Sequence, residues 1–239
     1  DARLPAARRY IVDHHLNEVF PGGRGDLGLI VQGGLYNSLV RALQQLGLAD
    51  AFGGSTLSML VLNVTCPLAP EEIRDFCLGK RAVLVVEEGQ PEFIEQEILA
   101  ILRRLDVNTP IHGKDVLALA GEYTVEVITR GLAAFVARHA PDLSLDAGQA
   151  WLKANAARRD AVTTQLGAPL PARPPQFCIG CPERPVFAAL KLLQQDIGRV
   201  HIAADIGCHS FAAFEPFSSG HTILGYGMSL ASAAGVAPI

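Results

Sequence analysis

Residues 26–139 alternate short, continuously apolar segments with amphipathic ones, and this alternation constrains the fold more than any other feature of the chain. The apolar segments are too short for buried helices but suit strands covered on both faces: 27–32, 58–64, 81–86 and 107–111. Between them, apolar residues recur at helical spacing. The pattern predicts a mostly parallel sheet with helices on both faces, a three-layer α/β domain over 26–140.

Three helices of this domain are marked by apolar residues on one face. The sets are Leu35, Leu39, Ala42, Leu43 and Leu46, then Ile94, Ile98, Ile101, Leu102 and Leu105, then Val125, Ile128, Leu132, Phe135 and Val136. Pro70, followed by two glutamates, predicts a further helix start, because proline suits the first turn and acids suit its positive end.

The composition changes on either side of this domain. Residues 141–176 combine Pro141, an Ala-rich polar stretch and a run of prolines, which predicts a linker. A second three-layer α/β unit is predicted over 177–239, with a helix near 185–195 and a strand at 199–204. Residues 1–25 are expected to be an arm of a preceding domain. Because the first residue is not Met and 231–239 reads as a helix running into a turn, we expect a truncated piece of a longer protein.

Bulk composition excludes several classes of partner. Of the 239 residues, 49% are hydrophobic and 18% charged, and the formal net charge is −4, so no basic excess exists to bind nucleic acid. No apolar run has the length of roughly 20 residues that spans a membrane, and no signal peptide is recognisable. The five cysteines are an odd number and do not form a disulfide framework, which favours a reducing, cytoplasmic location.

Cys178 and Cys181 form a C-x-x-C pair, and Cys208 follows a predicted strand end. Sites of α/β proteins lie at such strand ends, so the three thiols are candidates for one metal centre. An iron–sulfur cluster takes four thiolates, whereas His209 beside Cys208 offers a zinc site of Cys3His type. The C-x-x-C pair alone is also compatible with a redox-active dithiol or a structural turn. Isolated cysteines such as Cys66 are expected to be buried small hydrophobes.

Other polar and glycine-rich segments are weaker candidates. Gly225, Gly227 and Gly235 flank a run of small residues, which allows a phosphate to approach backbone amides but also allows close helix packing. The segment 112–115 is a polar cluster after a predicted strand. Residues 87–88 are two glutamates after another strand, and we expect a solvated loop there rather than a catalytic pair.

Taken together, these segments resemble the alpha subunit of indolepyruvate:ferredoxin oxidoreductases. RPPQFCIGCPER at 173–184 looks like the family's CPGCPHR-type motif, ADIGC at 204–208 is similar to its DIGC motif, and GYGMSLASAAG at 225–235 resembles its glycine-rich segment. Upstream, residues 86–88, 111–115 and 120–122 resemble the domain between the family's two thiamine-binding domains. The resemblance covers 26–239 in order, which implies a transketolase C-terminal-like domain followed by part of a thiamine-diphosphate-binding domain.

The resemblance implies an enzyme that binds thiamine diphosphate and Mg²⁺. It oxidatively decarboxylates arylpyruvates such as indolepyruvate to an aryl-acetyl-CoA, uses coenzyme A, passes electrons through a 4Fe-4S cluster to ferredoxin, and works with a beta subunit in amino-acid catabolism. By matching position, the cluster ligands are Cys178, Cys181 and Cys208. The implied neighbours of the thiamine cofactor are Gly180, Pro182, Glu183, Asp205, Gly207, His209, Gly225 and Gly227.

Two departures from the family pattern affect these expectations. Glu183 stands where the family's motif has His, which places an anion near the cofactor. No GDG…N segment for Mg²⁺ and diphosphate is present in 1–239, so the fragment alone is expected to be inactive. The alternative functions are a non-catalytic α/β binding module stapled by zinc, and a thiamine-dependent 2-oxoacid decarboxylase without the redox step.

Overall fold

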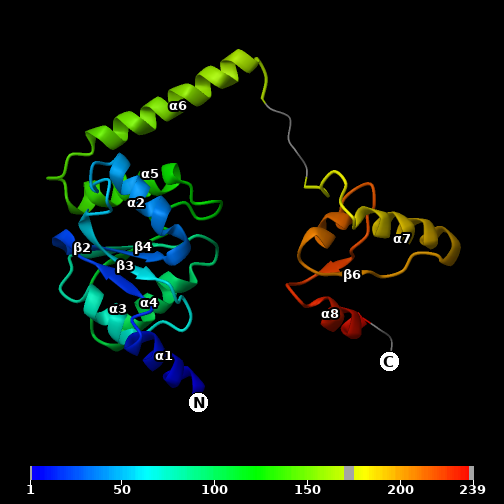
Figure 1. Ribbon diagram of the computed structural model, residues 1–239, viewed down its shortest axis with the longest axis horizontal. Coiled ribbons are helices and arrows are strands. Elements are labelled where there is room, and N and C mark those ends of the chain that lie inside the picture. Colours follow the sequence, from blue (N-terminus) through cyan, green and yellow to red (C-terminus); the bar gives the residue numbers. More distant parts are fainter. Residues whose placement is uncertain (1, 170–174, 237–239) are drawn as a thin grey trace. The chain divides into compact units, whose positions relative to one another are not determined.

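The structure is a computed structural model that describes residues 2–169 and 175–236. The chain divides into two units, residues 1–167 and 168–239, shown in blue to yellow-green and in yellow to red in Figure 1. Each unit is described by itself.

The first unit is built on a five-stranded sheet with the strand order β1-β3-β2-β4-β5. The strands are β1 (Glu18–Phe20), β2 (Gly22–Gln32), β3 (Ser55–Leu62), β4 (Ala82–Val86) and β5 (Ile111–His112). β2 pairs in parallel with β3 and β4, and β4 with β5, while β1 is antiparallel to β3. The predicted mostly parallel sheet is therefore confirmed, with one antiparallel edge strand that the apolar pattern did not indicate.

Helices cover both faces of this sheet (Figure 1). α2 (Tyr36–Gln45) and α5 (Val125–His139) cover one face, and α3 (Pro70–Cys77) and α4 (Phe93–Arg104) cover the other. The remaining helices of this unit are α1 (Arg3–Asp13) and α6 (Asp146–Leu166), and a 3-10 turn at Gly33–Leu35 precedes α2. In β2, Leu29 and Val31 pack under α2 and α5, while Ile30 packs under α3 and α4. Successive side chains of a strand point to opposite faces, so one apolar segment serves both cores.

The N-terminal segment, expected as an arm of a preceding domain, packs on the first unit. Ile11 of α1 is buried, and Arg8 Nε donates a hydrogen bond to the Leu68 carbonyl at 2.9 Å. β1 then pairs with β3, placing Val19 opposite Leu60. The physical reason is that β3 would otherwise present unpaired N–H and C=O groups at the sheet edge, and the short polar segment before β2 pairs with them.

Residues 146–166 form a helix rather than the linker expected for 141–176. Their Ala, Arg, Lys, Gln and Leu residues favour a helix even without an apolar face. The start of α6 packs against the end of α2, because Gly148 is buried against Leu46. Residues 170–174 of the expected linker, with Pro171 and Pro174, lie outside the described residues.

The second unit contains α7 (Arg184–Ile197), β6 (Ala203–Ala204), a 3-10 helix η2 (Cys208–Ala213), β7 (Thr222–Ile223) and α8 (Ser229–Val236). β6 and β7 are parallel, which agrees with the predicted α/β class, although the sheet has two strands in the described part of this unit. The buried residues of its core are Phe177, Phe187 and Ala212. Among the helices described in either unit, none has both the length and the apolarity needed to cross a bilayer.

Candidate functional site

The C-x-x-C pair lies in a tight turn that leads into α7. The Cys181 amide donates to the Cys178 carbonyl at 3.2 Å, and the Arg184 amide donates to the Cys181 carbonyl at 3.3 Å. Gly180 has φ +75°, a left-handed conformation that glycine adopts without a side-chain clash. Cys178 is exposed, Cys181 is half-buried, and the exposed Pro182 follows them. The turn thus presents its first thiol to solvent and directs the second toward the core.

Cys208 begins η2, and residues 205–207 connect it to the end of β6. Gly207, at φ +138°, turns the chain, and its amide donates to Ser210 Oγ at 3.2 Å. Ser210 Oγ in turn donates to the Gly207 carbonyl at 2.7 Å. The strand end and turn expected from the sequence are therefore present, and they leave Cys208 and His209 exposed.

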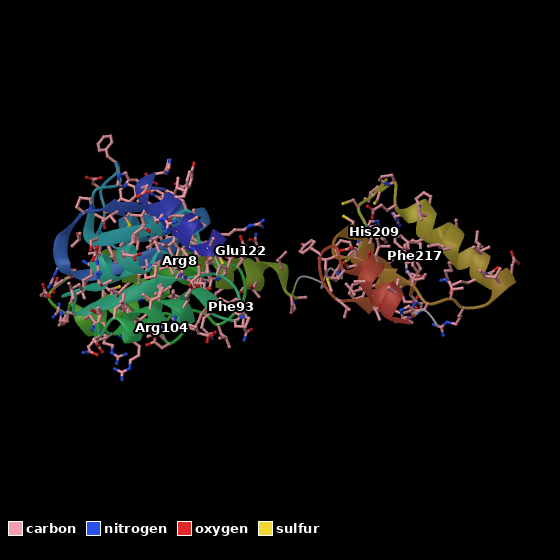
Figure 2. The ribbon with its side chains drawn as sticks, turned by 90° about the horizontal axis from the view of Figure 1, so that it is seen from below. Arg8, Phe93, Arg104, Glu122, His209 and Phe217 are labelled. Carbon is pink, nitrogen blue, oxygen red and sulfur yellow. The ribbon has the colours of Figure 1, made fainter. Side chains whose placement is uncertain are left out.

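Aromatic side chains join these two turns. The Phe177 ring lies 5.5 Å from that of Phe187 and 6.1 Å from that of Phe211, so the residue before Cys178 packs against both α7 and η2. His209, labelled in Figure 2, lies edge-on to Phe187 with ring centroids 6.0 Å apart. The two cysteine-bearing turns therefore contact each other through the small core of this unit.

Glu183 and His209 provide a polar contact between the same turns. Glu183 Oε2 lies 3.7 Å from His209 Nε2, beyond hydrogen-bond distance, and this oxygen is buried with no hydrogen-bond partner among the described residues. A carboxylate oxygen in that state has unused capacity to accept a hydrogen bond. The glutamate that departs from the family motif is therefore the least satisfied polar group of this site.

The three thiols do not form a ready metal site. Within residues 2–169 and 175–236, no group of three or more Cys, His, Asp or Glu side chains is close enough together to hold a metal ion. Cys178, Cys181 and Cys208 are all free thiols. The residues present do not fit a 4Fe-4S cluster in this arrangement, and the assignment of the three cysteines as ligands stays a prediction.

Asp205 organises the glycine-rich segment. Its carboxylate accepts hydrogen bonds from the Gly227 amide at 2.7 Å, the Ser229 hydroxyl at 2.9 Å and the Ile206 amide at 2.9 Å. The Gly227 amide, followed by the Ser229 hydroxyl, holds the pKa of Asp205 below its ordinary value. The carboxylate thus stabilises the start of α8 as an anion at a helix N-terminus.

This arrangement changes the expectation for the glycine-rich segment. Of the amides expected to meet a phosphate near Gly225 and Gly227, that of Gly227 donates to Asp205 and that of Met228 donates to the Gly225 carbonyl. Gly227 has φ +73°, which explains the glycine by backbone conformation alone. As arranged here, the segment does not offer these two amides to a diphosphate.

Of the predicted site residues, the structure therefore brings together Glu183 with His209, and Asp205 with Gly227. It does not bring the three thiols together. The contact of the three cysteines and the eight other predicted site residues with a cofactor stays a prediction.

Sequence reasoning missed a polar network in the first unit, at the carboxyl ends of β4 and β5. Glu87, expected in a solvated loop, is buried and accepts hydrogen bonds from the Ile94 and Glu95 amides at 2.9 and 3.1 Å, which caps α4. Lys114 Nζ donates to the Glu87 carbonyl at 2.6 Å and contacts the hydroxyl of Tyr123 at 2.7 Å. Burial lowers the pKa of Lys114. Tyr123 carried no sequence signal, because it lies in a loop without periodicity.

Comparisons with known proteins show a family to which most of the first unit is similar. The family model of the indolepyruvate ferredoxin oxidoreductase middle domain matches residues 16–115, from just before β1 to just after β5. The matched range includes β1, which pairs with β3 in the structure.

Curated relatives extend the similarity beyond the middle domain. The chain is 27% identical over 230 residues to the indolepyruvate oxidoreductase subunit IorA of Methanothermobacter thermautotrophicus, covering 93% of this chain and 33% of that protein. It is 27% identical over 242 residues to IorA of Archaeoglobus fulgidus, covering 99% of this chain and 34% of that protein. The chain spans about a third of the length of the curated relatives it matches.

Similarity to solved structures is lower. A 2-oxoglutarate:ferredoxin oxidoreductase from Magnetococcus marinus aligns with a TM-score of 0.37 and 18% identity, over 49% of this chain and 19% of that one. A split-gene transketolase described as an inactive beta4 tetramer aligns with a TM-score of 0.34 and 16% identity, over 48% of this chain and 42% of that one. These scores support no functional inference.

Proposed function

We propose that this chain is part of the alpha subunit of a thiamine-dependent 2-oxoacid:ferredoxin oxidoreductase that acts on arylpyruvates such as indolepyruvate. The observation that carries the proposal is the alignment with IorA over 93% of the chain, which runs through both units rather than the middle domain alone. The proposed partners are a beta subunit, coenzyme A and ferredoxin.

Bound thiamine diphosphate, with Mg²⁺, would supply the carbanion chemistry of decarboxylation. The chain's own residues have simpler tasks. Asp205 fixes the start of α8 to the end of β6 through the Gly227 amide and the Ser229 hydroxyl. Glu183 holds an unpartnered carboxylate oxygen beside His209, at the junction of the two cysteine-bearing turns. In our proposal this junction lies near the cofactor, and Glu183 is the group that a cofactor or substrate donor would satisfy.

The proposed activity is tested with the holoprotein, purified anaerobically together with its beta subunit. We expect bound thiamine diphosphate and reduction of a low-potential dye that depends on both indolepyruvate and coenzyme A. Free aldehyde as the product, with no dependence on coenzyme A, would instead support a simple decarboxylase. A protein that contains zinc but neither iron nor thiamine would support the non-catalytic binding module.

The cysteine assignment has its own test, Cys178→Ala in the same holoprotein. If Cys178 is a cluster ligand, iron content and dye reduction fall while thiamine binding is retained in part, because soft thiolates hold the iron. The control is Cys66→Ala in the first unit, since Cys66 was expected to be buried but is an exposed thiol. Unchanged iron content in the Cys178 variant would show that the ligand assignment is wrong.

A further inference from the structure

Two histidines of the first unit meet edge to edge at the end of the sheet. His112 Nε2, from β5, lies 3.0 Å from His139 Nε2, at the last residue of α5. The ring centroids are 4.7 Å apart, and both rings pack on Phe135. His112 is buried and His139 is half-buried. This contact joins the carboxyl end of α5 to β5.

The neighbouring carboxylate determines which nitrogen carries each proton. His112 Nδ1 lies 2.6 Å from Asp115 Oδ2, and a carboxylate only accepts, so His112 Nδ1 carries a hydrogen. In the neutral ring His112 Nε2 is then an acceptor, and His139 Nε2–H must donate to it. A first proton can be added at His139 Nδ1 without disturbing this bond. A second proton has to enter at His112 Nε2, and both facing nitrogens then become donors.

The charges that face the pair are mostly positive. Arg138 lies on the same turn of α5 and approaches Asp115 at 3.8 Å, while Arg81 precedes β4 and also acts on His139. Asp115 is the carboxylate that directly contacts the pair. Burial, then the charges of His112, Arg138 and Arg81, lower the pKa of His139. A lowered folded-state pKa means that stability is present above the ordinary imidazole pKa and is lost as pH falls through and below it.

We propose that the His112–His139 contact is a proton-operated joint, which holds the end of α5 against β5 with no more than one proton on the pair and opens when both imidazoles are protonated. Opening frees the last turn of α5, where the Ala140 amide donates to the Val136 carbonyl. Residues 140–145 connect that turn to α6, so protonation would loosen the connection between α5 and α6. The inference does not depend on the proposed enzymatic activity.

The first test follows the imidazole signals of the full chain by NMR, with EDTA present to exclude metal chelation by the two nitrogens. We expect two coupled titrations, because the facing nitrogens share one hydrogen bond. The second protonation should coincide with changed backbone signals at 136–140. Two independent titrations, or unchanged backbone signals at 136–140, would overturn the proposal without any substitution.

The second test compares hydrogen exchange of the last turn of α5 in the natural chain and in His139→Gln. Glutamine can donate to His112 Nε2 or accept from it, so it keeps the contact in either protonation state. In the natural chain, protection should fall roughly tenfold or more between about pH 7.5 and about pH 5, the range in which histidine titrates. In the variant it should change far less. An equal loss in both proteins, or no loss in the natural chain, would refute the joint.

Discussion

The two units of the chain differ in how much apolar surface they bury. In the first unit, all five residues of β4 are buried, and apolar clusters fill both faces of the sheet. In the described part of the second unit, the buried hydrophobic residues are Phe177, Phe187, Ala204 and Ala212, while large apolar side chains such as Ile197, Tyr226 and Leu230 are exposed. The first unit buries enough apolar surface to define its own fold, and the second buries far less.

This difference teaches where the sequence motifs act. The motif-rich second unit places its cysteines and glycines in turns held by a few aromatic contacts and by Asp205. The first unit carries fewer recognisable motifs, yet its polar side chains, such as Glu87, lie among well-packed residues. The unit that carries more recognisable motifs is therefore the one with less buried apolar surface.

The largest effect is expected from Leu29→Ala in β2. Leu29 is fully buried between the sheet and its helices. Removing its side chain leaves a cavity and should lower the free energy of unfolding of the first unit by roughly 2–5 kcal/mol, as measured by urea denaturation.

Leu119→Ala is the matched control, because the Leu119 side chain is 54% exposed. It should change the free energy of unfolding by no more than about 0.5 kcal/mol. Equal effects of the two substitutions would mean that the first unit does not owe its stability to this core.

The second prediction compares one helical glycine from each unit. A Cβ on Gly131 of α5 would lie 2.2 Å from Leu117 Cδ2 and 3.2 Å from the Val116 carbonyl oxygen, whereas a Cβ on Gly235 of α8 meets nothing within 4 Å. Gly131→Ala should destabilise the first unit by roughly 1–3 kcal/mol through overpacking. Gly235→Ala should stabilise α8 by roughly 0.5–1 kcal/mol through helix propensity.

The stability of both glycine variants is measured by thermal unfolding, with helix content followed by circular dichroism. A stabilised first unit in Gly131→Ala would show that Leu117 moves aside without cost. The close packing around Gly131 and the open space around Gly235 would then not distinguish the two units.

The smallest effect concerns α6. This helix belongs to the first unit, but most of its residues are exposed, as in the second unit. Its Arg159 binds the Glu126 carboxylate of α5 in a bidentate pair at 2.5 and 2.9 Å. This pair, with Arg130, lowers the pKa of Glu126 to about 2. Glu126→Gln should weaken the attachment of α6 by about 0.2–1 kcal/mol, the range for solvent-screened ion pairs.

The single tryptophan, Trp151, lies half-buried in α6 and reports this attachment by its fluorescence. Because the folded-state pKa of Glu126 is below its ordinary value of 4.5, the stabilisation is present above that value and is lost as pH falls toward 2. Acrylamide quenching should rise over this interval in the natural chain and be high throughout in the Gln variant. Identical quenching profiles would show that the ion pair does not hold α6.

Periodicity predicted most of the first unit. The helix face of Leu39, Ala42 and Leu43 is buried as expected, and Pro70 begins α3. The strand expected at 107–111 is reduced to Ile111–His112, and the one at 199–204 to Ala203–Ala204. Strand length depends on which neighbour offers hydrogen bonds, and apolar content alone does not encode that.

The site was predicted less completely than the fold. The C-x-x-C turn and the turn at Gly207 are local features, so their spacing and glycines were informative. Glu87 and Tyr123 are joined by Lys114, which lies 27 residues from Glu87 in the chain, so no local pattern reveals their contact. The contact of His112 with His139 likewise joins residues of different elements, which no local pattern reveals.

The sequence by itself determined the α/β class, the order of the main elements and the two turns that carry the cysteines, because periodicity, proline and glycine act over a few residues. Only the tertiary structure decided that residues 18–20 complete the first sheet, that α6 contacts α5 through Glu126, and that Asp205 engages the Gly227 amide. Each of these depends on hydrogen-bonding groups that meet only when distant segments pack together.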